Sequence, residues 1–154
     1  MSKRLYIFLT FVVVAIIFSC KKSQPAQNVQ NNCVVNQVSQ IPVNITILAG
    51  SGQFFPISVV GGFTYVYLQS PSKGIVVYRL SQNQFMAFER SCTQDGCNNT
   101  KALVWVQTGN TTLKDSICGS TFSIYDGSVQ TTPAKIPLYQ YHTSWDGNQL
   151  HIYN

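Results

Sequence analysis

Two short stretches of the chain combine cysteine with glycine and an acidic residue, and cysteine is the residue type that binds soft metals or forms disulfides. Residues 92–97 read Cys-Thr-Gln-Asp-Gly-Cys, and residues 115–120 read Asp-Ser-Ile-Cys-Gly-Ser. Glycine allows the tight turns that such loops need. Because a strand-like segment separates the two stretches, we expect both loops to close over one shared centre.

The N-terminus predicts a lipoprotein signal peptide over residues 1–19. A positively charged start is followed by an apolar run, residues 5–18, that is too short to span a membrane comfortably. The run leads into Ile-Phe-Ser-Cys, which resembles the bacterial lipobox, whose cysteine becomes the lipidated N-terminus. We therefore expect Cys20 to carry lipid and to anchor the protein in the bacterial cell envelope, facing the periplasm or the cell surface. An ordinary secretion signal or a short membrane anchor is the alternative.

The remaining chain divides into a tether and one domain. Residues 20–32, which comprise the lipidated N-terminus and a polar linker, contain too few apolar side chains to form a core. Residues 33–154 are long enough for one hydrophobic core and too short for two. We expect the linker to hold this single domain away from the membrane.

The charge of the chain does not indicate a nucleic-acid partner. The formal net charge is +5, but loss of Lys3 and Arg4 with the signal reduces the ten basic residues to eight against five acidic ones, or +3. The chain contains no run of basic residues. The expected partners are the membrane, through the N-terminal lipid, and an unidentified protein or small molecule in the envelope.

Strand-like segments follow one another through the domain. They are short, rich in Val, Ile, Tyr, Phe and Thr, and separated by Gly, Pro, Asn and Ser. No apolar repeat of 3.6 residues persists long enough to predict a helix. The sequence therefore predicts an all-β antiparallel sandwich or small barrel, with strands in residues 43–48, 57–60, 63–68, 74–80, 84–89, 103–107, 122–125, 138–145 and 149–153.

The two cysteine loops resemble the cluster-binding loops of Rieske proteins. Those proteins hold a 2Fe–2S cluster with a Cys-x-His box and a later Cys-x-x-His-Gly-Ser box, so that one iron binds two thiolates and the other two imidazoles. Residues 92–97 resemble the longer first form, Cys-Thr-His-Leu-Gly-Cys, and residues 119–122 match Gly-Ser-x-Phe. The mature chain is similar to the small Rieske-like lipoproteins of Bacteroidota. This resemblance implies a Rieske-like β domain with a two-loop subdomain.

Three of the four ligand positions depart from the Rieske pattern. In chain order, the four positions hold Cys92, Gln94, Asp115 and Cys118. Only Cys92 keeps the residue type of the family, and the two histidines of the chain, His142 and His151, lie far from both loops in the final hairpin. The resemblance implies a 2Fe–2S cofactor, but this ligand set does not suit one, and we expect neither the cluster nor another metal. No common catalytic motif is present, and no enzymatic activity is predicted.

Disulfides are the expected substitute for the cluster. With Cys20 lipidated, the cysteines that remain in an oxidising compartment allow three pairings, and they are Cys33, Cys92, Cys97 and Cys118. Many Rieske domains join their two loops by a disulfide, and Cys97 occupies one of its two positions. The resemblance therefore favours a Cys97–Cys118 bridge, with Cys92–Cys118 as the competing pair.

Three functions are consistent with these residues. The leading one is a lipid-anchored, cluster-free Rieske-like module with a binding or structural role. The second is electron transfer by a 2Fe–2S centre with atypical ligation by Cys92, Asp115 and Cys118. The third is a thiol–disulfide redox protein that uses Cys92, Cys97 and Cys118.

Overall fold

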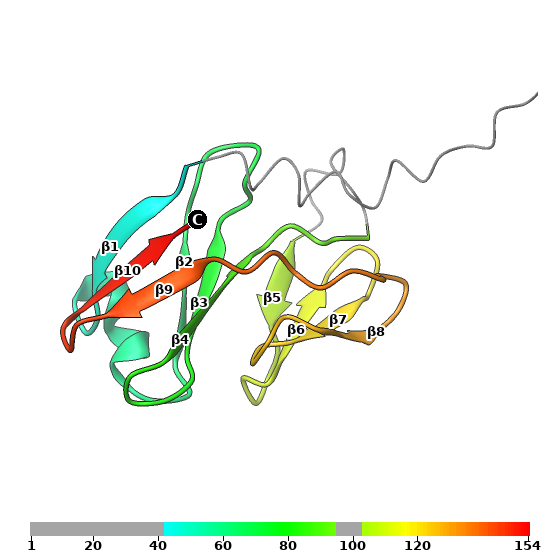
Figure 1. The fold of residues 1–154 in the computed structure, drawn as a ribbon. Coiled ribbons are helices and arrows are strands. Elements are labelled where there is room, and N and C mark those ends of the chain that lie inside the picture. Colours follow the sequence, from blue (N-terminus) through cyan, green and yellow to red (C-terminus); the bar gives the residue numbers. More distant parts are fainter. Residues whose placement is uncertain (1–41, 95–102) are drawn as a thin grey trace, which may run out of the picture.

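The computed structural model describes residues 42–94 and 103–154, which form an antiparallel all-β fold (Figure 1). The strands of the described residues make two three-stranded sheets and one four-stranded sheet. Every strand pair within these sheets is antiparallel. The predicted all-β class is therefore confirmed.

The two three-stranded sheets form the larger part of the domain. The first has the order β1-β10-β9, with β1 at Asn44–Leu48, β10 at Gln149–Tyr153 and β9 at His142–Trp145. The second has the order β2-β3-β4, with β2 at Phe63–Val66, β3 at Ile75–Arg79 and β4 at Phe85–Glu89. Backbone hydrogen bonds from Glu89 to Tyr139 and from Tyr141 to Ala87, both 2.9 Å, join β4 to the segment that leads into β9.

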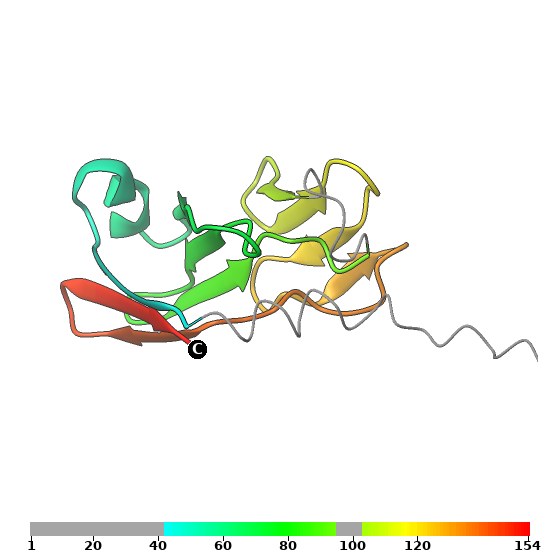
Figure 2. The same cartoon turned by 90° about the horizontal axis from the view of Figure 1, so that it is seen from above.

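The four-stranded sheet forms a smaller subdomain beside this larger part (Figures 1 and 2). Its strands follow the chain order, with β5 at Val104–Val106, β6 at Thr112–Asp115, β7 at Thr121–Ser123 and β8 at Val129–Thr131. The chain enters the subdomain after β4 and returns through the extended segment before β9. The subdomain is thus an insertion between two strands of the larger part.

Strand β3 separates two hydrophobic cores. Its residues are all buried, and successive side chains of a strand point to opposite faces. Ile75 and Val77 pack with residues of β1 and β10 in the first core, whereas Val76 and Tyr78 belong to the second core. The second core also contains Cys92 and apolar residues of the subdomain, so burial of this core holds the cysteine loops against the larger part.

The predicted strand at residues 57–60 is wrong. The chain forms a 3-10 helix there, η1 at Gly52–Ser58, in which Pro56 has no N–H to donate to a strand neighbour. Ile57 is buried, while Val59 and Val60 are exposed, so the β-branched run does not alternate as a strand would. Among the described residues, no helix is long and apolar enough to cross a membrane.

Candidate functional site

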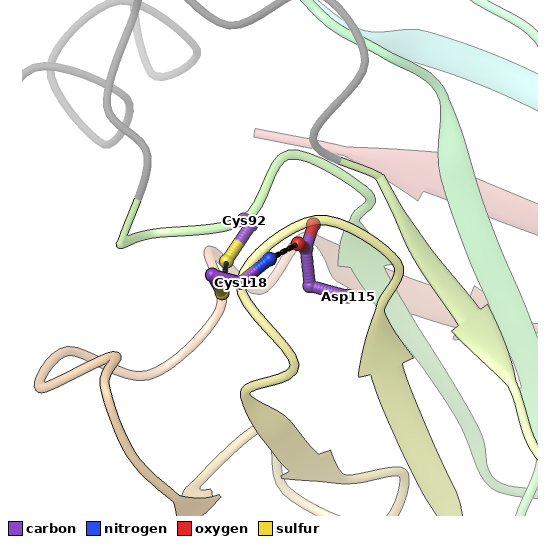
Figure 3. A group of neighbouring side chains, drawn as sticks. All are labelled: Cys92, Asp115 and Cys118. Carbon is purple, nitrogen blue, oxygen red and sulfur yellow. Dashed lines mark hydrogen bonds between the residues drawn. The ribbon is translucent and has the colours of Figure 1, made fainter.

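The two cysteine loops meet at one edge of the subdomain. The first loop continues from β4 and contributes Cys92, and the second is the turn between β6 and β7, which contributes Asp115 and Cys118 (Figure 3). The Sγ atoms of Cys92 and Cys118 lie 3.4 Å apart, and both thiols are free. These sulfurs and a carboxylate oxygen of Asp115 all lie within 4.8 Å of one another. The loops therefore share one centre, as their composition predicts.

Asp115 shapes the second loop. Its Oδ1 accepts hydrogen bonds from the backbone N–H groups of Ile117 and Cys118, each 2.7 Å long. Its backbone N–H donates to the Ser120 carbonyl, and its carbonyl accepts from the N–H of Gly119. Gly119 has a φ of 77°, a conformation that residues other than glycine rarely adopt. An Asp that caps its own turn and a glycine that reverses the chain together place Cys118 opposite Cys92.

Further hydrogen bonds hold the Cys118 sulfur. Cys118 Sγ and Ser120 Oγ are 3.0 Å apart, and the backbone N–H of Ser120 points to the same sulfur at 3.4 Å. Ser120 Oγ in turn accepts a 2.8 Å hydrogen bond from the backbone of Ala134. Cys118 is a half-buried residue, and these contacts fix the position of its sulfur.

Cys92 is enclosed by the second core. Its side chain has an exposed fraction of 0%. The next residue, Thr93, donates from Oγ1 to the carbonyl of Ile136 over 2.6 Å and so ties the first loop to the segment after β8. The Cys92 side chain is therefore closed off from solvent.

The surroundings of Cys92 disfavour its thiolate. Burial raises the pKa of the Cys92 thiol well above its ordinary value, and the hydrogen bond with Cys118 and the Asp115 carboxylate raise this pKa further. The backbone N–H of Gln94 acts in the opposite direction and is too weak to reverse the shift. At neutral pH, Cys92 is a protonated thiol.

Asp115 has one carboxylate oxygen without a partner. The residue is completely buried, and Oδ2 has no hydrogen-bond partner, although Oδ1 has two. A buried polar atom without a partner costs about 1–3 kcal/mol and is uncommon in folded proteins. A carboxylate oxygen of Asp115 lies within 4.8 Å of the two sulfurs, so this incompletely bonded carboxylate belongs to the centre.

A Rieske 2Fe–2S cluster does not fit these residues. It needs two thiolates on one iron and two imidazoles on the other. Among the described residues, only one group of three suitable donors is present, Cys92, Asp115 and Cys118. His142 and His151 lie on β9 and β10, on the sheet away from the subdomain (Figure 1). The centre therefore lacks the imidazole pair of the Rieske pattern.

The other predicted site residues are placed as follows. Gln94 is half-buried in the first loop, where its backbone contacts the Cys92 sulfur. Cys20, Cys33 and Cys97 lie outside the described residues, so the preferred Cys97–Cys118 bridge stays a prediction. The competing pair, Cys92 and Cys118, is the one whose sulfurs are in contact.

The sequence analysis missed a buried carboxylate, Glu89, at the end of β4. Its exposed fraction is 0%. Its two oxygens accept five hydrogen bonds, from Ser72 Oγ (2.7 Å), Lys73 N–H (2.8 Å), Ser91 N–H (3.1 Å), Ser91 Oγ (2.9 Å) and Tyr141 Oη (2.9 Å). The signal in the sequence is a Glu-Arg pair at the end of an apolar strand, directly before Ser91 and Cys92.

Arg90 is the second buried charge that the sequence analysis missed. Its guanidinium lies between the rings of Tyr65 and Trp105, 4.2 Å from each centroid, and Nε donates to the Val104 carbonyl. Burial lowers the pKa of Arg90 from its ordinary value, although the neighbouring tyrosines and Glu89 partly oppose this. Because Tyr65 belongs to β2 and Trp105 to β5, Arg90 joins the larger part to the subdomain.

Comparison of the sequence with protein-family models and with curated proteins gives no match. Among solved structures, the chain is similar to a chain in the complex of reduced oxygenase and oxidized ferredoxin in carbazole 1,9a-dioxygenase, with 18% identity over 72% of this chain and 93% of the other, and a TM-score of 0.50. It is also similar to a cyanobacterial plasma membrane Rieske protein from Synechocystis PCC 6803, with 22% identity over 58% and 84% and a TM-score of 0.47.

A third similar structure is the Sphingomonas yanoikuyae B1 ferredoxin, with 20% identity over 64% of this chain and 93% of the other, and a TM-score of 0.45. These likenesses concern the fold. The domain has the all-β Rieske-like fold, in which a larger part carries a small subdomain with two loops at its edge.

Proposed function

We propose that this protein is a lipid-anchored component of the bacterial cell envelope whose Rieske-like domain has lost its 2Fe–2S cluster and serves as a binding or structural module. The observation that supports the proposal is the donor set of the centre. Two thiols and one carboxylate occupy positions where the cluster would need two cysteines and two histidines. The two loops therefore have the arrangement of Rieske cluster-binding loops, but their side chains are not the two cysteines and two histidines that bind the cluster.

The loops do not need a cluster to stay together. Asp115 caps the second loop, Thr93 ties the first loop to Ile136, and Cys92 is packed in the second core. A disulfide between the loops would add to these contacts by restricting the unfolded chain, with a typical contribution of about 2–4 kcal/mol. A module of this kind keeps a rigid edge for an envelope partner without iron.

The anchor is tested by changing Cys20→Ala. The unchanged protein should be processed at Cys20 and fractionate with membranes, because the acyl chains of a processed lipoprotein hold it firmly. The variant should accumulate as an unprocessed precursor. Cys33→Ala is the matched control and should be processed normally. Cleavage and lipid modification of the Cys20→Ala variant would show that the lipobox interpretation is wrong.

The cluster-free state is tested by the thermal unfolding midpoint of the protein exported by its native host. We expect a chelator to leave the midpoint unchanged and a disulfide reductant to lower it, because disulfides rather than metal join the loops. A midpoint that falls on chelation and is insensitive to reduction would contradict the proposal.

A further inference from the structure

The two cysteines of the centre differ in their burial. Cys118 is half-buried on the second loop, whereas Cys92 is completely buried beneath it, and their sulfurs are 3.4 Å apart. A disulfide bond is about 2.05 Å long, so the sulfurs need to approach by about 1.4 Å to form one. A half-buried cysteine in contact with a fully buried one is the arrangement in which a first thiol attacks and a second thiol resolves.

The environment of Cys118 suits the attacking role. Thiolate is the nucleophile in thiol–disulfide exchange. The backbone N–H of Ser120 donates to the Cys118 sulfur, and the Cys118 thiol donates to Ser120 Oγ, so these contacts hold the sulfur in place opposite Cys92. The neighbouring Ile117 has an exposed fraction of 51%, so it offers an apolar contact for a partner that approaches Cys118.

The environment of Cys92 requires a proton acceptor. Burial and its neighbours keep Cys92 protonated, so it cannot attack until it loses its proton. A carboxylate oxygen of Asp115 lies within 4.8 Å of both sulfurs, and Oδ2 of the same carboxylate is buried without a hydrogen-bond partner. Transfer of the Cys92 proton to this carboxylate would allow Cys92 to attack.

We propose that Cys118, Cys92 and Asp115 form a thiol–disulfide exchange site for disulfide-bonded proteins of the envelope. The Cys118 thiolate attacks the partner disulfide, forms a mixed disulfide and releases the first partner thiolate, which takes up a proton. Asp115 then accepts the proton of Cys92, whose thiolate attacks the Cys118 sulfur and releases the second partner thiolate. The Asp115 proton passes to that thiolate.

The products are a Cys92–Cys118 disulfide and two partner thiols, so two electrons move from this protein to its partner. The same steps in reverse order oxidise a partner dithiol and restore both cysteines. A tetrahedral zinc site is the competing use of the three residues. It would place two thiolates about 3.8 Å apart at the usual Zn–S length of about 2.3 Å, and a metal analysis of the purified protein separates the two uses.

The first test uses the reduced full-length protein in detergent and dipyridyl disulfide as the probe, with peptide mapping to assign each cysteine. The wild type should release two pyridinethiones from the pair and end as a Cys92–Cys118 disulfide without label. Cys92→Ser should release one and keep a stable mixed disulfide on Cys118. Cys118→Ser should label Cys92 at least about tenfold more slowly than Cys118 reacts in the wild type, because Cys92 is buried.

The second test separates proton transfer from structure. In Asp115→Asn, Oδ1 still accepts the two backbone hydrogen bonds, so the loop should fold and the first step should keep its rate. The second step should be slower than in the wild type. Its rate should rise by about tenfold for each unit of increase in pH, because only hydroxide then removes the Cys92 proton. Circular dichroism confirms that the variants are folded. An unchanged second step would overturn the role of Asp115.

Other results would overturn the exchange site as a whole. These are a wild-type protein that keeps label on both cysteines, a Cys118→Ser variant that reacts as fast as the wild type, or a stoichiometric zinc ion lost in Cys92→Ser. The inference uses the cluster-free centre of the proposed function. Iron and sulfide in the protein would refute both, whereas a cluster-free protein without exchange would refute this inference alone.

Discussion

Two carboxylates, Glu89 and Asp115, are completely buried in the same small domain and have opposite surroundings. Glu89 accepts five hydrogen bonds, which include those from Ser72, Ser91 and Tyr141. Asp115 accepts two hydrogen bonds on Oδ1 and none on Oδ2. Both oxygens of Glu89 have hydrogen-bond partners, whereas one oxygen of Asp115 has none.

This difference indicates a structural role for Glu89 and a reactive role for Asp115. A buried charge is tolerated where hydrogen bonds replace the lost water, and Glu89 meets that requirement. It connects the segment before β3, the end of β4 and the segment before β9, so it stabilises the larger part. Oδ1 of Asp115 accepts the hydrogen bonds that shape the turn, whereas Oδ2 has no partner and can accept a proton. Four predictions examine this contrast.

The largest effect is expected for Glu89→Ala. The variant leaves five donors without their acceptor, four of them buried, and we expect the free energy of unfolding to fall by about 4 kcal/mol. Denaturant unfolding measures it. Asp126→Ala removes an exposed carboxylate and should change this free energy by less than about 1 kcal/mol. Similar values for the two variants would remove the structural role given to Glu89.

Arg90→Met should have the next largest effect. Methionine keeps the apolar stem but loses the charge between the rings of Tyr65 and Trp105, and we expect a loss of about 2 kcal/mol in the free energy of unfolding. Lys114→Met, at an exposed position of β6, is the matched control and should be neutral. If Arg90→Met is equally neutral, the guanidinium does not join the two parts of the domain.

Alkaline pH should destabilise the reduced protein. Burial raises the pKa of Cys92 and of Tyr141, whose ordinary values are 9.0 and 10.0. As the pH rises, the unfolded chain loses these protons before the folded protein does. The free energy of unfolding should therefore be constant with respect to these groups below pH 9. It should decrease by about 1.4 kcal/mol per pH unit above the ordinary pKa of each group. Tyr141→Phe should make this decrease shallower. Stability that rises between pH 9 and pH 11 would contradict the assigned environments.

The smallest stability effect is expected for Asp115→Asn. Asparagine retains the Oδ1 acceptor of the turn, so the free energy of unfolding should change by less than about 1 kcal/mol, whereas Asp115→Ala should lose about 1–2 kcal/mol. Urea unfolding of both variants measures the difference. A large loss of unfolding free energy in Asp115→Asn would mean that the negative charge of Asp115 stabilises the loop. That result would contradict the contrast between Asp115 and Glu89.

The sequence predicts much of the fold because strand composition is local. Residues 74–80 and 84–89 contain β3 and β4, and the closing hairpin contains β9 and β10. The run at residues 57–60 is an exception, because its β-branched residues favour a strand whereas Pro56 and its neighbours form the 3-10 helix η1. Spacing of cysteine and glycine also predicts that the two loops meet.

The buried charges were beyond sequence reasoning because their partners are distant along the chain. Tyr141 and Glu89 are 52 residues apart, and Arg90 lies between rings from two different sheets. The unequal exposure of Cys92 and Cys118 and the free Asp115 oxygen likewise arise from packing of the second core. Composition identifies these residues as candidates, and tertiary structure gives each of them its role.

The most direct test of the cluster-free centre is an analysis of iron and acid-labile sulfide, together with the visible spectrum, on protein purified anaerobically from iron-replete native cells. Two thiols and one carboxylate do not supply the Rieske ligand set, so the protein should be colourless and contain no stoichiometric iron or sulfide. A visible absorption band with two irons and two sulfides per chain would contradict the account and favour the alternative of an electron-transfer protein with atypical cluster ligands.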